Sequence, residues 1–147
     1  MGLFSRNPSQ KEQNDISQHI FWVQSSYQMM HDGCGIEVFV NCKQRVMTSL
    51  NTLIAYEKKY SSFFKNPKPT ANSAKVSREL PSVEKKFVDY TIINLERKLL
   101  KYTTDRGKRN NFNKEVDIFK YYAGEFLPQT VEYFDKQIHE RFSEYLQ

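Results

Sequence analysis

The sequence predicts an all-α fold, an antiparallel bundle of four long amphipathic helices, or of five if the last one is broken at Pro128. Apolar residues recur at intervals of three and four along most of the chain, which is the spacing of a helix with one buried face. Hydrophobic residues make up 39% of the sequence and aromatic residues 14%. This supply of apolar side chains predicts a packed core, since disordered chains are poor in them. At 147 residues, the chain has the length of a single domain.

The first helix is predicted to start at Ser9 and to stop at Asp32-Gly33. Ser9 and Glu12 have the spacing of a capping box, in which each side chain bonds to a backbone amide of the other residue. Glycine closes helices because it adopts the left-handed conformation without strain. Residues 1–8 are expected to form a flexible N-terminus.

A second helical pattern runs from Ile36 to Phe64. Residues 33–35 leave room only for a reversal of the chain, so the first two helices should form an antiparallel hairpin. The segment 36–40 also alternates like a strand, but no partner strand is evident elsewhere. We therefore favour the helix.

Residues 65–81 are predicted to be a linker, because three of the five prolines lie there and proline removes a helical amide donor. The third helix should follow from Val83 and end near residues 105–107. The last helical pattern, from residue 112 to residue 145, stays in register across Pro128. No Ser, Thr, Asp or Asn directly precedes Pro128 to cap a new helix, so we favour one helix kinked there over two helices.

Several classes of protein are disfavoured. The longest uncharged apolar run, residues 20–23, is far shorter than the roughly 18 residues that a membrane span needs. No secretory signal is recognisable, and Arg6 replaces the Ser or Thr of a myristoylation signal, so a cytoplasmic location is predicted.

The abundance of Lys, Asn, Tyr and Phe is typical of an AT-rich coding source and suggests a bacterial or phage protein.

No metal or cofactor site is predicted. His31 and Cys34 lie three residues apart, but Cys42 alone cannot complete a set of ligands. Asp135 and His139 lie one helical turn apart and are expected to form an exposed ion pair. No Gly-x-Ser-x-Gly turn and no glycine-rich phosphate loop occurs, so the chain is predicted not to be an enzyme.

Charge is distributed unevenly. Residues 1–66 carry a balance of +2, residues 67–114 of +7 and residues 115–147 of −4. The turn expected between the last two helices holds seven cations and one acid, Asp105. Such cations bind nucleic acids by releasing counterions from the phosphates, and Tyr102 and Phe112 are candidate stacking groups. The candidate contacts are Arg97, Lys98, Lys101, Arg106, Lys108, Arg109 and Lys114.

The same cluster has simpler interpretations. Charges at a helix end are usually just solvated, and cations there stabilise the last carbonyl groups of the helix. An acidic protein or an anionic membrane surface would also fit the charge.

Tyr121, Tyr122 and Tyr133 form a candidate interface. With Tyr145, they are too many for one face of the last helix, so some must lie at the surface. Aromatic residues with polar tips are enriched in protein interfaces. We therefore expect a protein partner or self-association.

The stretch from Tyr121 to Phe134, which contains Phe126-Leu-Pro-Gln-Thr130, resembles the Tyr-Leu-Pro-x-Thr segment near the end of a bacterial helical family linked to hydrolysis of halogenated indolyl phosphates. The resemblance covers about a tenth of the chain, and the N-terminal membrane segment of that family has no counterpart here. The resemblance therefore assigns no family.

Together, these patterns predict a non-catalytic helical interaction module that binds a protein partner or itself. The alternative is a nucleic-acid-binding domain that acts through residues 97–114. A small enzyme is the least favoured class.

Overall fold

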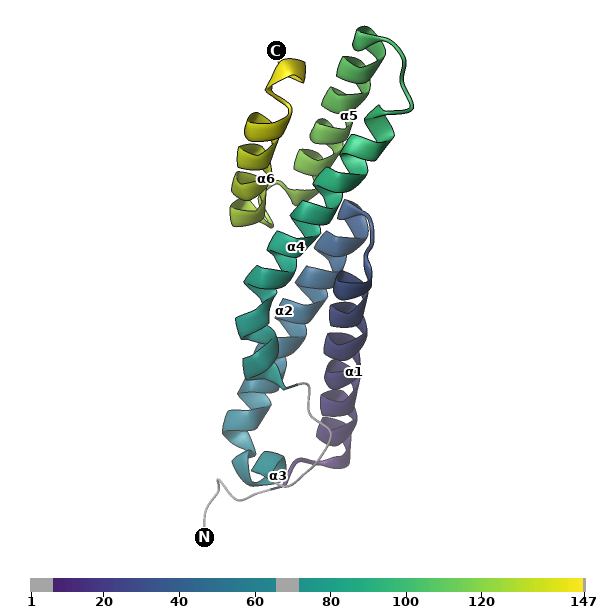
Figure 1. Ribbon diagram of the computed structural model, residues 1–147. Coiled ribbons are helices and arrows are strands. Elements are labelled where there is room, and N and C mark those ends of the chain that lie inside the picture. Colours follow the sequence, from purple (N-terminus) through teal and green to yellow (C-terminus); the bar gives the residue numbers. More distant parts are fainter. Residues whose placement is uncertain (1–6, 66–71, 147) are drawn as a thin grey trace. The chain divides into compact units, whose positions relative to one another are not determined.

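The computed structural model describes residues 7–65 and 72–146, and these ranges contain helices and turns but no strand. Its elements are α1 (Gln10–Asp32), α2 (Ile36–Lys59), α3 (Ser61–Lys65), α4 (Ser73–Leu99), α5 (Asp105–Ala123), α6 (Pro128–Arg141) and the 3-10 helix η2 (Ser143–Tyr145) (Figure 1). The predicted all-α bundle is confirmed, in its five-helix form, with α3 and η2 as short additions.

The chain divides into two compact units. The N-terminal unit comprises Met1–Cys34 and Asn41–Leu80, and the C-terminal unit comprises Gly35–Val40 and Pro81–Gln147. Helices α2 and α4 therefore each contribute residues to both units. The single-domain organisation stays a prediction.

In the N-terminal unit, α1 and α2 are antiparallel, as the hairpin prediction requires. The expected capping box begins α1: the Glu12 amide donates to Ser9 Oγ (3.1 Å), and the Ser9 amide donates to Glu12 Oε1 (3.0 Å). Gly33 follows α1 with a φ of 98°, in the left-handed region that favours glycine. The Tyr56 hydroxyl donates to Asp15 and the Tyr60 hydroxyl to Glu12, both at 2.7 Å, which joins the two helices.

The bond from Tyr60 is expected to control the ionisation of Glu12. The Tyr60 hydroxyl and then the Ser9 amide lower the pKa of Glu12 from 4.5 to about 2. A lowered carboxyl pKa stabilises the fold while the group is ionised, so this contribution is complete above about pH 4.5 and is lost as the pH falls towards 2. Tyr60→Phe should raise the pKa of Glu12 towards 4.5 in a carbon-13 NMR titration. Tyr56→Phe removes the same kind of bond from Asp15 and should leave Glu12 near 2, and an equal response in both variants would contradict the assignment.

In the C-terminal unit, four stacked phenylalanine rings form the centre of the core. Phe39 of α2 stacks on Phe87 of α4 with 3.9 Å between ring centroids. Phe87 lies 6.3 Å from Phe119 of α5, and Phe119 lies 3.8 Å from Phe134 of α6. All four are buried. Each helix thus contributes one ring, and this chain of rings holds α5 and α6 against α4.

The structure corrects part of the predicted linker at 65–81. Residues 66–71 lie outside the described residues, as do residues 1–6 of the expected flexible N-terminus, but α4 begins at Ser73 and continues through Pro81. A proline inside a helix costs about 3 kcal/mol. Burial of Val76, Leu80 and Val83 along one face of α4 offsets that cost, at about 1.5–3 kcal/mol for each side chain. The second helix is also shorter than expected, because α2 ends at Lys59.

The end of the third helix was placed wrongly as well. α4 ends at Leu99, and α5 begins at Asp105 after the N-cap Thr104. Thr104 Oγ1 accepts a hydrogen bond from the Gly107 amide (3.0 Å), and a Cβ added to Gly107 would lie 2.9 Å from that oxygen. Gly107 therefore permits a close cap inside the first turn of α5 and does not stop a helix.

The last helix is broken, not kinked, so the preferred interpretation of Pro128 was wrong. The amides of Gly124 and Leu127 bond to the carbonyl groups of Lys120 and Ala123, both at 2.9 Å, and close α5. Pro128 then occupies the first position of α6, where a missing amide hydrogen has no cost. Leu127, only 1% exposed, precedes α6 without a side-chain cap. Burial of this residue anchors the start of α6 in place of the polar cap that the sequence lacks.

Candidate functional site

The seven predicted cations come together at one end of the C-terminal unit, where α4 passes into α5. Arg97 and Lys98 lie in the last turn of α4, Lys101 lies in the connection, and the other four lie in the first half of α5. We call this set the basic end. It consists of Arg97, Lys98, Lys101, Arg106, Lys108, Arg109 and Lys114.

The basic end is largely unneutralised. Lys98 pairs with Glu115 at 3.3 Å, and the other six cations form no ion pair with any residue in 7–65 or 72–146. The start of a helix carries a partial positive charge. Cations in the first turns of α5 therefore add to its field, and Asp105 is the acid of this segment that opposes it. This end of the unit attracts anionic groups.

An apolar side chain lies within the basic end and was not singled out from the sequence. Leu100 follows the last residue of α4 and is 80% exposed, whereas its neighbour Leu99 is buried. The spacing held a signal that could have found it, because Leu99 continues the buried face of α4 from Leu95 and so turns Leu100 outward. Of the two predicted stacking groups, Tyr102 is partly exposed, but Phe112 is fully buried against Phe142 and cannot stack on a ligand.

The three tyrosines of the predicted interface do not form one patch. Tyr121 is 81% exposed, and its ring lies edge-on to that of Tyr122. The Glu37 carboxylate on α2 raises the pKa of Tyr122, and the Asp89 carboxylate on α4, which accepts from the Tyr133 hydroxyl at 2.6 Å, raises the pKa of Tyr133. Tyr122 and Tyr133 therefore serve contacts inside the unit, and Tyr121 is the one of the three that solvent largely surrounds.

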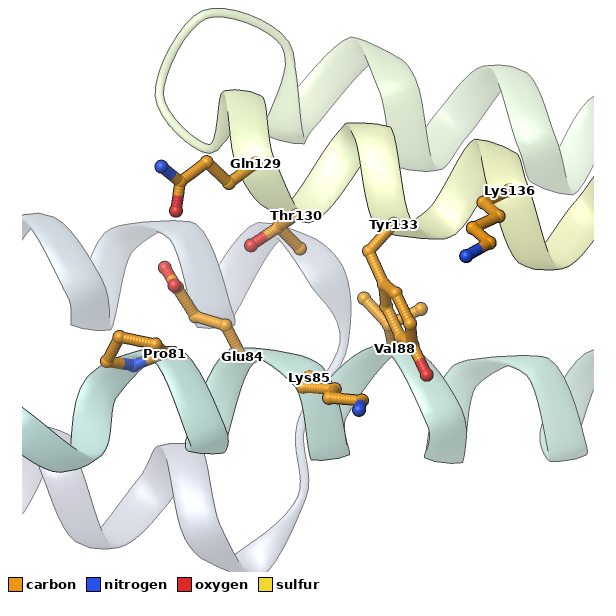
Figure 2. Close-up of a pocket in the computed structure, with 8 residues that line it drawn as sticks. All are labelled: Pro81, Glu84, Lys85, Val88, Gln129, Thr130, Tyr133 and Lys136. Carbon is orange, nitrogen blue, oxygen red and sulfur yellow. The ribbon is translucent and has the colours of Figure 1, made fainter.

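A groove runs between α4 and α6. Two cavities of about 380 and 410 Å³ lie along it and share Lys85 and Tyr133 as lining residues. Figure 2 shows the first cavity: the Tyr133 side chain reaches from α6 towards α4, and the Glu84 carboxylate points from α4 towards the Gln129 side chain at the start of α6. No sequence pattern indicated this groove, because its two walls come from segments that are about 40 residues apart in the chain.

Several polar groups of the groove bind to its own walls. The Tyr133 hydroxyl donates a hydrogen bond to the Asp89 carboxylate. The Lys85 ammonium lies 5.5 Å from the centroid of the Tyr133 ring and forms a cation–π contact with it. Arg141 pairs with Glu96 at 3.6 Å. Neither cavity is lined by Ser, Cys or His, so the groove provides no Ser–His or Cys–His pair of the kind that nucleophilic catalysis uses.

Other candidate clusters also remain incomplete. Within the described ranges, no group of three or more His, Cys, Asp or Glu residues could hold a metal ion. Cys34 and Cys42 are free, and burial raises the pKa of both thiols, which keeps them protonated and weakly nucleophilic at neutral pH. No helix in the described part of the chain is long and apolar enough to span a membrane.

The expected ion pair between Asp135 and His139 is wrong. The Asp135 carboxylate binds Lys120 of α5 at 2.7 Å, and His139 Nδ1 is hydrogen-bonded to the Asp135 carbonyl oxygen at 2.8 Å. The fold brings a permanently charged ammonium group to Asp135, and this contact between helices replaces the local one.

Comparison of the chain with protein-family models, curated proteins and solved structures finds no match in any of the three. Residues 126–130, part of the stretch with the family resemblance noted in the sequence, lie at the start of α6, and Leu127 and Thr130 are buried there. Its residues thus have a structural role here.

Proposed function

We propose that this chain is a non-catalytic interaction module whose C-terminal unit binds a protein partner or a second copy. The observation that carries the proposal is the exposure of three large apolar side chains at the turns of that unit: Leu100 is 80% exposed, Tyr121 81% and Phe126 60%. Single apolar residues on a surface are ordinary. Leu100 and Tyr121, however, are the most exposed large hydrophobic residues in the described chain, and Phe126 is as exposed as Phe21 of α1 (61%); burial in an interface would contribute about 1.5–3 kcal/mol for each.

A photo-crosslinking residue placed at position 121 tests this proposal in the cells that make the protein. The expected result is one discrete crosslinked product, whose mass and peptides identify a second copy or another protein. The same residue at Lys58, an exposed position in the N-terminal unit, is the matched control and should give no such product. Identical band patterns at the two positions would count against the proposal.

A second candidate is nucleic-acid binding by the basic end. Its six cations without an ion pair in the described ranges favour this function, because phosphate contacts require cations that internal acids do not neutralise. Tyr102, 38% exposed, is the one predicted stacking group that can reach a base.

If this candidate is correct, the combined change Arg106→Ala, Lys108→Ala and Arg109→Ala should reduce the salt dependence of binding. For duplex DNA, the slope of log K against log salt should fall in magnitude by about 2.7 if each cation contacts one phosphate. Fluorescence anisotropy with a labelled duplex measures this slope. The control is Lys11→Ala, Arg45→Ala and Lys58→Ala, which removes the same charge from exposed positions of the N-terminal unit and should leave the slope unchanged. Absence of DNA and RNA binding by the unaltered protein at low salt would eliminate this candidate.

A further inference from the structure

We propose that copies of this chain associate head to tail, with the basic end of one copy bound to the opposite end of the C-terminal unit of the next. This inference rests on the proposed interaction function and names its partner as a second copy. The opposite end is where α5 passes into α6, and we call it the acidic end. It consists of the carboxylates of Glu37, Glu125 and Glu132 and the exposed side chains of Tyr121 and Phe126.

The acidic end carries carboxylates that no cation neutralises. Glu125 lies in the turn before α6, and Glu132 lies in the second turn of α6. Both are exposed, and neither forms an ion pair within the described part of the chain. Glu37 lies in the first turn of α2, and its carboxylate is near enough to Tyr122 in the last turn of α5 to raise the pKa of that tyrosine.

Few cations near the acidic end are free to neutralise it. Residues 115–147 hold three cations, and acids within the unit bind two of them. Lys120 binds Asp135 at 2.7 Å, and Arg141 binds Glu96 at 3.6 Å. The third, Lys136, lies one turn beyond Glu132.

Helix α5 keeps the two ends apart. The 15 residues from Arg106 to Tyr121 rise by about 22 Å along the helix, whereas salt screens exposed charges beyond about 8 Å at physiological ionic strength. The basic end therefore cannot be neutralised by the acidic end of its own copy. It can be neutralised by the acidic end of another copy.

Apolar side chains on both ends favour a second copy over a phosphate ligand. Leu100 lies within the basic end, and Tyr121 and Phe126 lie within the acidic end. A nucleic-acid backbone leaves Leu100 without an apolar contact, whereas the acidic end provides two aromatic rings together with the opposite charge. Contact between different ends is heterologous, so the association does not close at a dimer and larger oligomers form as concentration rises.

Sedimentation velocity with two charge-swapped variants tests this arrangement. The unaltered protein should show an average mass that rises with concentration at about 50 mM salt, and the association should weaken about tenfold or more at about 500 mM. Arg106→Glu, Lys108→Glu and Arg109→Glu together cancel the net charge of the basic end and leave the acidic end unchanged, and Glu125→Lys with Glu132→Lys makes both ends basic. Each variant alone should remain a monomer, and an equimolar mixture of the two should associate again.

Recovery in the mixture separates a contact between the two ends from misfolding, and unchanged circular dichroism of each variant confirms that it is folded. A strict monomer for the unaltered protein at low salt, or a mixture that stays monomeric, overturns the inference. Binding of the monomer to anionic phospholipid vesicles or to oligonucleotides would then assign the basic end to phosphate groups. Crosslinking at position 121 to a different protein would sustain the proposed function while the head-to-tail inference fails, so the two failures are distinguishable.

Discussion

Phe119→Ala is expected to lower the free energy of unfolding by about 3–5 kcal/mol, the cost of truncating a buried phenylalanine. The Phe119 ring is 2% exposed, and it stacks on Phe134 at 3.8 Å and lies 6.3 Å from Phe87. Its loss interrupts the chain of rings that joins α4, α5 and α6. Urea denaturation followed by circular dichroism measures the change.

The neighbouring position provides the control for this prediction. Ile118 lies on the same helix but is 38% exposed, so Ile118→Ala should cost less than about 1 kcal/mol. If the two substitutions had similar effects, the stacked rings would not be the centre of this core.

Periodic apolar residues were sufficient to predict the helices, because each helix buries one face. The spacing of the apolar residues on that face can be read from a short stretch of sequence. The capping box at Ser9 and the reversal at Gly33 are equally local, and both are confirmed. The errors occurred where distant residues determine the outcome. Leu127 anchors the start of α6 by burial, which no neighbouring residue in the sequence reveals.

The two misjudged prolines illustrate this limit. Pro81 was expected to lie in a linker, yet it is inside α4, because buried side chains on both sides of it hold the helix in place. Pro128 was expected inside a helix, yet it begins one, because the chain can reverse at Gly124. The local effect of proline is the same at both positions. The packing partners decide whether a helix continues through it.

The candidate site shows the same division between composition and packing. The membership of the basic end follows from the sequence alone, since seven cations within 18 residues must lie near one another. The sequence could not show that Phe112 faces the core while Leu100 faces solvent, or that the Tyr133 hydroxyl is taken by Asp89. These properties depend on which side of α4 the other helices cover.

A substitution in the N-terminal unit tests the single-domain prediction, which is the organisational question that remains. Leu50 of α2 is 2% exposed, and Leu50→Ala is expected to cost about 2–5 kcal/mol. Met47 on the same helix is 41% exposed, so Met47→Ala is the control and should cost less than about 1 kcal/mol.

The number of unfolding transitions is the decisive measurement. Helices α2 and α4 each contribute residues to both units, so the unfolding of one unit leaves the α2 and α4 segments of the other unit with frayed ends. We therefore expect Leu50→Ala and Phe119→Ala to shift one shared, cooperative transition in urea. Two transitions, with each variant shifting only its own, would show that the units unfold independently and that the single-domain prediction is wrong.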